Sequence, residues 1–333
     1  EAFKNLFSDK SYHVERFISE DFRKKLIEIL KKDKYDIVQL EMIYMAPYIE
    51  TIRDNSDALI VLRAHNVEHL IWDRIAKKTT FLPKKWYLNH LVKTLKEYEL
   101  NVINKVDGIA AITYRDAAFF RGETATPVVD IPYGVNPEEF TPNYEVKEKP
   151  TLYHIGSMNW MPNEEGIRWF LKNVWNKLME RKPEIVLNLA GRHTPKWLMN
   201  IKKKNVKVWG EVADAKEFIK NNDIAIVPLL SGSGIRIKII ESMAMGKTVI
   251  TTMIGAEGIQ YSEYNNIIIA DTPTKIVETI CRITDNPDEI RRIGKNARKL
   301  IEDLYDNKKI IERLLIFYDE ISQTKKDITY ISH

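Results

Sequence analysis

A loop of small residues leading into a helix is the part of this sequence best suited to binding a ligand. Residues 231–250 read Ser-Gly-Ser-Gly-Ile-Arg-Ile-Lys-Ile-Ile-Glu-Ser-Met-Ala-Met-Gly-Lys-Thr-Val-Ile. The free N–H groups at the start of such a helix attract an anion. Arg236 and Lys238 place positive charge in the first turn, where the helix dipole disfavours it, so we expect an anion such as a diphosphate between them. Glu241, further along the helix, could accept two hydroxyl hydrogen bonds, as a ribose diol offers. A surface helix with ordinary charges is the alternative interpretation.

Several other kinds of site lack support in the sequence. Gly246-Lys247-Thr248 looks like the end of a P-loop, but the glycine that a P-loop needs five residues earlier is replaced by Glu241. A strand, not a helix, is also expected to begin at Thr248. The sequence has no Asp-x-Asp, no Cys/His spacing suited to zinc, and no Gly-x-Gly-x-x-Gly after a strand. We therefore expect no bound metal and no separate cofactor.

The pattern Gly-x-Arg-x-Lys-x-x-Glu-x-Met-Ala-x-Gly-x-x-Val begins at Gly234 and resembles the donor-binding signature of the family 4 glycosyltransferases. The resemblance implies that Glu241 holds the ribose of a nucleotide-sugar donor. It also implies that Arg236 and Lys238 neutralise the departing diphosphate. Many members carry a second glutamate eight residues before the first, close to the donor sugar. Ser233 occupies that position here, so the resemblance leaves the sugar open, and Ser233 and Gly234 are counted among the donor-binding residues.

Further donor contacts are predicted at the ends of strands in the second half of the chain. The strand and loop around Gly156 are similar to the family's first strand and loop, whose glycine lets the backbone approach the donor phosphates. Asn163 is expected to cap the next helix, with direct contact to the ligand as the alternative. Arg192 follows the next strand and either reaches a phosphate or faces solvent. The turn that contains Glu211 resembles the family's nucleobase edge, which implies a donor contact there.

In the first half of the chain, His65 ends a predicted strand. The segment 63–68 resembles the family's His-containing loop, which lies near the donor sugar or the acceptor. We therefore count His65 with Arg236 and Lys238 as catalytic, with a structural or exposed histidine as the alternative. Residues 131–140 resemble the family's interdomain segment, although Asn136 stands where Asp is usual, and we interpret them as a hinge.

The elements that must position these residues alternate between strand and helix, which predicts parallel sheets. The strands predicted in the first part are Tyr12–Phe17, Asp36–Glu41, Leu59–His65, Gly108–Thr113 and Val128–Pro132. Those in the second part are Leu152–Ile155, Val186–Ala190, Val206–Trp209, Ile224–Pro228, Thr248–Thr252 and Ile267–Ile269. The helices predicted between them include Ser19–Lys32, Lys84–Asn104, Asp116–Phe120, Asn163–Arg181 and Arg236–Met245. Strands that end in glycine and lead into a helix mark the carboxyl edge of a doubly wound sheet, where ligands bind.

With 333 residues, the chain is too long for one ordinary core. The resemblance implies the α/β GT-B fold, with two Rossmann-like doubly wound domains facing a cleft. We expect an acceptor-side domain over residues 1–142, a nucleotide-sugar-binding domain over 143–310, and a C-terminal helix over 311–333 that packs back on the first domain. The family's first domain starts with a strand and a Gly-rich loop that find no match here, so the first domain is expected to lack its N-terminal units.

The charge and amino-acid composition of the chain limit the kinds of partner that it can bind. The net charge of +4 is too small to indicate nucleic-acid binding, and no apolar run reaches the length of a membrane span. The single cysteine, Cys281, fits a reducing compartment, so we expect a cytoplasmic protein. Residues 77–87 mix lysines with bulky apolar side chains, which suits peripheral contact with the inner face of an anionic membrane. A solvated loop before a long helix is the alternative.

The resemblance implies a retaining glycosyltransferase that moves a hexose from a nucleotide-diphospho-sugar to a glycan or lipid-linked acceptor, in surface polysaccharide synthesis. A covalent double displacement needs a positioned carboxylate nucleophile, and none is identified. Front-face transfer is therefore favoured. Two alternatives remain open: a GT-B nucleotide-sugar epimerase, and a non-catalytic nucleotide-sugar-binding protein.

Overall fold

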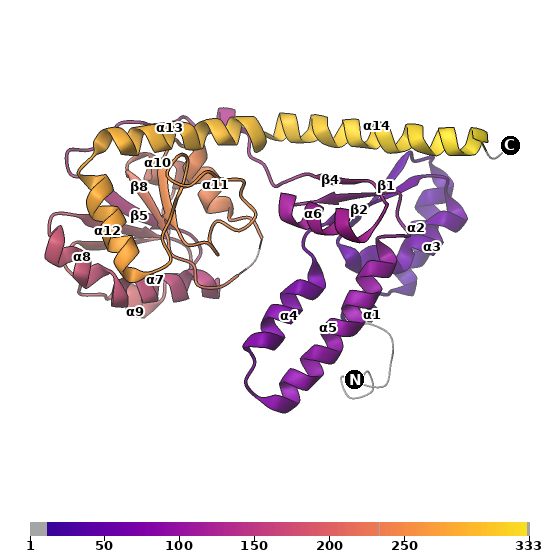
Figure 1. Ribbon diagram of the computed structural model, residues 1–333, viewed down its shortest axis with the longest axis horizontal. Helices are drawn as coiled ribbons and strands as arrows, with labels where there is room; N and C mark the ends of the chain where they lie inside the picture. The colour runs from indigo at the N-terminus through magenta and orange to yellow at the C-terminus, as the bar shows by residue number, and fades with distance from the viewer. Residues whose placement is uncertain (1–11, 233, 332–333) are drawn as a thin grey trace. The chain divides into compact units, whose positions relative to one another are not determined.

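The computed structural model of the chain describes residues 12–232 and 234–331 (Figure 1). Its internal contacts divide the chain into two compact units. Unit 1 comprises Glu1–Pro132 and Ile311–His333, and unit 2 comprises Tyr133–Ile310. Each unit is built around its own parallel sheet, so the predicted α/β class is confirmed.

Unit 1 contains a four-stranded parallel sheet in the order β1-β2-β3-β4. The strands are β1 (Ile37–Glu41), β2 (Leu59–Ala64), β3 (Gly108–Ala111) and β4 (Val128–Asp130). The helices are α1 (Tyr12–Glu15), α2 (Glu20–Lys32), η2 (Ile43–Tyr48), α3 (Ile49–Asn55), α4 (Glu68–Lys78), α5 (Leu82–Val102) and α6 (Tyr114–Glu123). Strand β2 is buried along most of its length because elements pack on both of its faces, as expected for a central parallel strand.

Helices α4 and α5 form an antiparallel pair that extends away from the sheet of unit 1 (Figure 1). At the base of the pair, the buried carboxylate of Glu99 accepts hydrogen bonds from the backbone N–H groups of Glu68 and His69, at 3.0 and 3.3 Å. Glu99 also pairs with Nδ1 of His69 at 2.5 Å. A side chain of α5 therefore satisfies the free N–H groups at the start of α4 and fixes where the pair begins.

Helix α14 (Asn307–Ile331) contributes its residues from Ile311 onward to unit 1. Phe317 packs over Gly108 on β3, where an added Cβ would lie 2.8 Å from the Phe317 ring. The hydroxyl of Tyr318 donates a hydrogen bond to the side chain of Gln39 on β1. Helix α14 therefore packs on the sheet formed by β1 to β4, although more than 170 residues separate it from β4 in the sequence.

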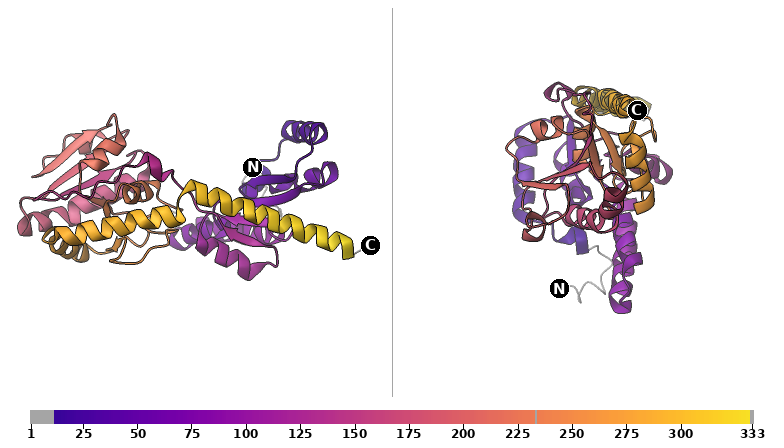
Figure 2. Two further views of the ribbon diagram at one scale, coloured as in Figure 1. Left: turned by 90° about the horizontal axis from the view of Figure 1, so that it is seen from above. Right: turned by 90° about the vertical axis from the view of Figure 1, so that its left-hand side faces the viewer.

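Unit 2 contains a six-stranded parallel sheet in the order β10-β9-β8-β5-β6-β7. The strands are β5 (Thr151–Ile155), β6 (Val186–Ala190), β7 (Val206–Gly210), β8 (Ile224–Val227), β9 (Thr248–Thr251) and β10 (Ile268–Ile269). The short helix η3 (Pro137–Glu139) comes before the first strand of this sheet. The other helices of the unit are α7 (Met161–Asn173), α8 (Trp175–Arg181), α9 (Lys196–Met199), α10 (Ala215–Lys220), α11 (Ile237–Ala244), α12 (Pro273–Thr284) and α13 (Pro287–Leu304). Helices lie on both faces of this sheet (Figure 2). Separate apolar cores fill the two faces, one built with α7, α8 and α12 and the other with α10 and α11.

The strand order of unit 2 reverses direction between β5 and β8, which is where ligands bind in doubly wound sheets. These strands pair through Leu152 with Ile224 and through Tyr153 with Ala225. One residue further along, a side-chain hydrogen bond replaces the backbone pairing: Nδ1 of His154 donates to the carbonyl of Ile226 at 2.8 Å. The two strands therefore separate toward their carboxyl ends, and a side chain bridges them where the backbone ladder stops.

Two predicted elements are wrong. Tyr12–Phe17, predicted as a strand, contains helix α1. Val14 and Phe17 both pack on the core of unit 1, and a spacing of three places them on one face of a helical turn, not of a strand. The helix predicted from Asn163 to Arg181 is two helices. The backbone distorts at Val174, after Asn173 turns its side-chain amide onto the carbonyl of Trp169.

Candidate functional site

The loop before α11 is held in place by Arg236. This residue is the N-cap of α11 and is buried, with 4% of its surface exposed. Its guanidinium donates to the carbonyl of Gly234 at 2.6 Å and to that of Ile254 at 3.5 Å. Gly232 and Gly234 adopt φ angles of +113° and +80°, which favour glycine. Burial lowers the pKa of Arg236, but a guanidinium stays charged at neutral pH.

Lys238 lies on the first turn of α11, as predicted, and is half-buried. Its Nζ donates a hydrogen bond to the side-chain oxygen of Asn163. The amide nitrogen of Asn163 donates in turn to the carbonyl of Ser157 at 2.8 Å. Burial disfavours the charged amine and Arg236 repels it, so the pKa of Lys238 falls to about 7. An anion beside this ammonium would restore its charge.

Asn163 therefore does not cap α7, and that prediction is wrong. The N-cap is Trp160, which makes no side-chain capping hydrogen bond. Asn163 is buried inside the helix and connects the loop after β5 to the ammonium of α11. Its partner Lys238 lies 75 residues away in the sequence, so no local pattern could reveal this role.

Glycines end the three strands β5, β6 and β7 at one edge of the sheet. The N–H of Gly156 donates to Ala190, and the N–H of Gly191 donates to Gly210, at 3.1 and 2.7 Å. A Cβ on Gly191 would lie 1.8 Å from the carbonyl oxygen of Gly156, and a Cβ on Gly156 would lie 2.6 Å from Nζ of Lys238. The ammonium therefore rests directly on the backbone of Gly156. This contact is possible because residue 156 is a glycine; a side chain there would have to displace the end of Lys238.

Glu241 lies on α11, one turn beyond Lys238, and is half-buried. Burial raises the pKa of its carboxyl group, and the positive charge of Lys216 opposes that shift. Among the residues that the structure describes, the Glu241 carboxylate has no hydrogen-bond partner. It is therefore available to accept hydrogen bonds from a ligand's hydroxyl groups.

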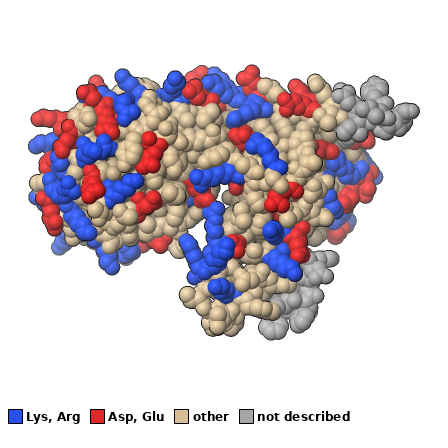
Figure 3. All heavy atoms as spheres, in the orientation of Figure 1, with Lys and Arg blue, Asp and Glu red and all other residues tan. Residues whose placement is uncertain are grey.

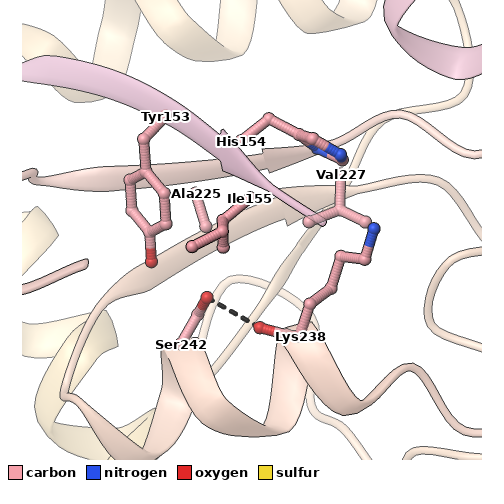
Figure 4. Close-up of a pocket in the computed structure, with 7 residues that line it drawn as sticks. All are labelled: Tyr153, His154, Ile155, Ala225, Val227, Lys238 and Ser242. Atoms are coloured by element: carbon pink, nitrogen blue, oxygen red, sulfur yellow. Dashed lines mark hydrogen bonds between the residues drawn. The ribbon is translucent and has the colours of Figure 1, made fainter. Parts of the chain in front are cut away.

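A small pocket lies beneath Lys238, between the sheet and α11 (Figure 4). It is lined by Tyr153, His154, Ile155, Ala225, Val227, Lys238 and Ser242, and it has no volume accessible to water. Burial, with Lys238 as a second cause, lowers the pKa of His154 to about 3. Because Nδ1 donates to Ile226, the Nε2 lone pair is the free acceptor of this neutral ring. Because the pocket has no room even for water, it is not a ligand site, and the side chains that line it instead pack beneath Lys238.

The remaining predicted residues are distributed as follows. Arg192 and Glu211 form an exposed ion pair of 3.1 Å at the ends of β6 and β7. Ser233 lies outside the described residues. His65 belongs to unit 1, where its Nε2 lies 2.8 Å from a carboxylate oxygen of Glu41. Within unit 2, the structure thus brings together Gly156, Arg236 and Lys238, with Glu241 following on the same helix.

The sequence analysis misjudged two residues of this site, because it missed Trp160 and favoured capping over ligand contact for Asn163. Trp160 lies beside both cations, with its ring centroid 5.6 Å from Arg236 Cζ and 5.6 Å from Lys238 Nζ. Asn163 is the second, as described above. Both fall within the Asn-Trp-Met-Pro-Asn stretch after Gly156, whose unusual polar and aromatic composition was the available signal. In the described part of the chain, no three His, Cys, Asp or Glu side chains are grouped so as to hold a metal ion.

Residues 149–286, which contain the unit 2 residues of this site, match the family described as Glycosyl transferases group 1. The match covers less than half of the chain and lies entirely within unit 2. The resemblance inferred from the Gly234 pattern is therefore confirmed at the level of this group. The matched residues include β5 with its glycine, the turn at Glu211 and the whole of α11.

Known proteins also resemble this chain beyond the matched segment. A Klebsiella pneumoniae protein named "Uncharacterized 44.6 kDa protein in cps region" is 24% identical over 306 residues, which cover 88% of this chain and 76% of the relative. Sucrose-phosphate synthase from Thermosynechococcus elongatus has a TM-score of 0.66 at 16% identity, covering 91% of this chain and 78% of that one. HepE from Anabaena, in complex with UDP, has a TM-score of 0.68 at 13% identity, covering 90% and 82%.

These structural matches establish the fold of the chain as that of the GT-B glycosyltransferases, as predicted. Further HepE structures with the same fold contain UDP with glucose, or UDP-glucose. Within the part of this chain that the structure describes, no helix combines the length and the apolar character that a membrane span requires.

Proposed function

We propose that this chain is a retaining glycosyltransferase that transfers a hexose from a nucleotide-diphospho-sugar to a glycan or lipid-linked acceptor. The observation that carries the proposal is the position of Lys238. Its ammonium lies on the backbone of Gly156, at the carboxyl edge of the sheet and next to the point where the strand order reverses. A diphosphate at that edge meets an ammonium, the N–H groups at the start of α11 and the guanidinium that holds the loop.

In the proposed reaction, the bond between the sugar C1 and the phosphate oxygen breaks, while the acceptor oxygen bonds to C1 on the same face. The acceptor's hydroxyl proton passes to the leaving phosphate oxygen. Negative charge gathers on the diphosphate as the bond breaks. Lys238, Arg236 and the start of α11 stabilise that charge electrostatically, in the role that a metal ion has in other transferases.

We propose that Glu241 accepts hydrogen bonds from the donor ribose. Its raised pKa reflects a partly desolvated carboxylate, which gains most from two hydroxyl donors. Gly156, Ser233 and Gly234 would line the diphosphate, while Arg192 and Glu211 would lie toward the nucleobase. His65, oriented by Glu41 in unit 1, would contact the sugar or the acceptor. The UDP-bound HepE structures support a UDP-sugar as the first donor to test.

The deciding experiment incubates the chain with a panel of UDP- and GDP-sugars, with and without glycan and lipid-linked acceptors, and identifies the products by mass spectrometry. Transfer to an acceptor is expected. Release of free nucleotide diphosphate together with an altered sugar, without acceptor, would indicate an epimerase. Donor binding without turnover would indicate a binding protein. The relative named for a cps region supports surface polysaccharide precursors as acceptors.

Variants of α11 test the assigned roles. Glu241→Ala and Lys238→Ala should each reduce donor turnover by about 100-fold or more, because each removes a charge-assisted contact with the donor. Lys207→Ala, which removes an exposed lysine from β7 in the same unit, is the matched control. Sugar transfer that stays at the parent rate in both α11 variants would contradict the assignment.

We also propose that unit 1 contacts an anionic membrane from the cytoplasmic side, through the end of the α4–α5 pair. Phe81, Leu82 and Trp86 are 67%, 75% and 63% exposed there. In Figure 3 this end is mostly free of charged groups and is bordered by Lys and Arg side chains. Apolar side chains at a projecting end, with lysines behind them, match the boundary between acyl chains and anionic headgroups.

Binding to anionic and neutral liposomes, measured by co-sedimentation, tests this contact. Replacing Lys84 and Lys85 by Ala should weaken binding to anionic liposomes about 30-fold, since each lysine contributes about 1 kcal/mol near such a surface. Replacing Lys31 and Lys32 of α2 removes the same charge elsewhere in unit 1 and should have little effect. Failure of the parent chain to bind anionic liposomes would end the proposal.

A further inference from the structure

Two positive side chains of the site share a single aromatic ring. The centroid of the Trp160 ring lies 5.6 Å from the guanidinium carbon of Arg236 and 5.6 Å from Nζ of Lys238. Both distances are within the range in which the negative face of an indole attracts a cation. Trp160 lies in the loop between β5 and α7 and keeps 38% of its surface exposed, so the ring borders the space in which a ligand would lie.

The groups around Lys238 do not otherwise favour its charge. Arg236 repels it from the same segment, and the ring of His154 on β5 is neutral. Glu257 acts on Arg236 rather than on Lys238. Among the residues that the structure describes, no carboxylate forms an ion pair with Lys238, whose hydrogen bond goes to the amide of Asn163. Lys238 is therefore held close to a like charge, that of Arg236, which Glu257 partly offsets, and both cations lie beside an uncharged ring.

The glycine-rich loop is fitted to this arrangement. A Cβ added to Gly232 would lie 3.1 Å from a terminal nitrogen of Arg236 and 3.4 Å from Cζ2 of Trp160. The backbone of Gly232, at φ +113°, therefore packs against both the ring and the guanidinium. The loop before α11, the cation pair and Trp160 form one packed unit.

We propose that Trp160 is a positioning residue that holds Arg236 and Lys238 together for the donor diphosphate without neutralising either of them. A carboxylate in the same place would hold the cations equally well, but it would cancel their charge and repel the diphosphate. An aromatic ring attracts cations through its quadrupole and adds no net charge. This inference deepens the proposed function and rests on it for the identity of the anion.

Trp160→Leu removes the ring and keeps an apolar side chain, whereas Trp160→Phe keeps a smaller ring. Two quantities decide the matter: the titration midpoint of the Lys238 amine in the ligand-free chain, followed by NMR and assigned with Lys238→Met, and the Kd of UDP-glucose. In Trp160→Leu, the midpoint should move to lower pH and the Kd at pH 7.5 should rise about three- to tenfold. Trp160→Phe should fall between this variant and the parent.

Met161→Ala, which truncates the adjacent and 70% exposed apolar side chain, is the matched control and should leave both quantities unchanged. An unchanged midpoint and Kd in Trp160→Leu would overturn the proposal, and so would equal effects in Met161→Ala. If the parent binds no nucleotide sugar, the proposed function fails, but the midpoint still decides whether Trp160 supports the charge of Lys238. If Trp160→Leu does not fold, Trp160→Phe and Trp160→Tyr supply the same comparison.

Discussion

The affinity of this chain for a nucleotide sugar should depend steeply on pH because of one amine. The pKa of Lys238 in the ligand-free chain is about 7, and a diphosphate binds the protonated amine. Between pH 6.5 and 8.5, the protonated fraction of such an amine falls from roughly three quarters to roughly 3%. The Kd of UDP-glucose should therefore rise about 25-fold over this interval, or close to 2 kcal/mol of binding free energy. Affinity is highest on the acid side because binding favours the charged form.

Isothermal titration calorimetry at several pH values measures this dependence. UDP-glucose is the appropriate probe, because its diphosphate has no proton to lose in this range, unlike that of free UDP. Lys238→Met should bind weakly at every pH and lose the dependence, while Lys238→Arg should keep a positive charge throughout and flatten it. A parent Kd that is equal at pH 6.5 and 8.5, or the same slope in Lys238→Met, would refute the reasoning.

The remaining predictions concern groups that support the site. The pKa of His154 is about 3 in the folded chain, against 6.5 ordinarily. The stability that His154 contributes is therefore complete above pH 6.5 and declines as the pH falls toward 3. In urea unfolding, the parent chain should lose about 2 kcal/mol of stability at pH 5 relative to its value above pH 6.5, and His154→Leu should lack this loss. Gly191→Ala should lower the free energy of unfolding by about 1–3 kcal/mol, because its Cβ would meet the Gly156 carbonyl, whereas Gly122→Ala on α6, with open space around it, should not destabilise the chain. Asn163→Asp should raise the pKa of Lys238, measured by NMR, and weaken UDP-glucose binding through the added negative charge; unchanged values would contradict the contact at Asn163.

Much of the fold could be predicted because its strands are short apolar runs, three of which, β5, β6 and β7, end at a glycine. Each strand predicted from Asp36 onward overlaps an observed strand, with ends that differ by at most two residues. Helix α4 and the elements η2 and α3 were not predicted. The Pro in η2 and the mixed composition of α4 obscure their helical periodicity, and Glu99, 31 residues from Glu68, completes the start of α4.

The sequence also predicted a donor site at α11, but it did not predict which contacts support the residues of that site. Arg236 was expected as a first-turn cation. It is instead a buried N-cap whose guanidinium holds the loop through the carbonyls of Gly234 and Ile254. Arg192 and Glu211 were predicted as separate donor contacts, and the structure pairs them with each other. Side-chain partners of this kind are chosen by packing between distant segments, which a linear pattern does not encode.

Through its Gly234 pattern the sequence resembled the glycosyltransferases, and by itself it determined the α/β class and the helix that carries Arg236, Lys238 and Glu241. These follow from local properties: periodicity, glycines at strand ends, and charges spaced along one helix. Only the tertiary structure placed Lys238 on the backbone of Gly156, joined it to Asn163 and set it beside the ring of Trp160. Those contacts join segments about 75 residues apart, and they exist because the parallel sheet brings the carboxyl ends of its strands to a single edge. The predicted anion site before α11 therefore takes its positive charge from Arg236 and Lys238 at the start of that helix. Its geometry depends on the end of β5 beside it.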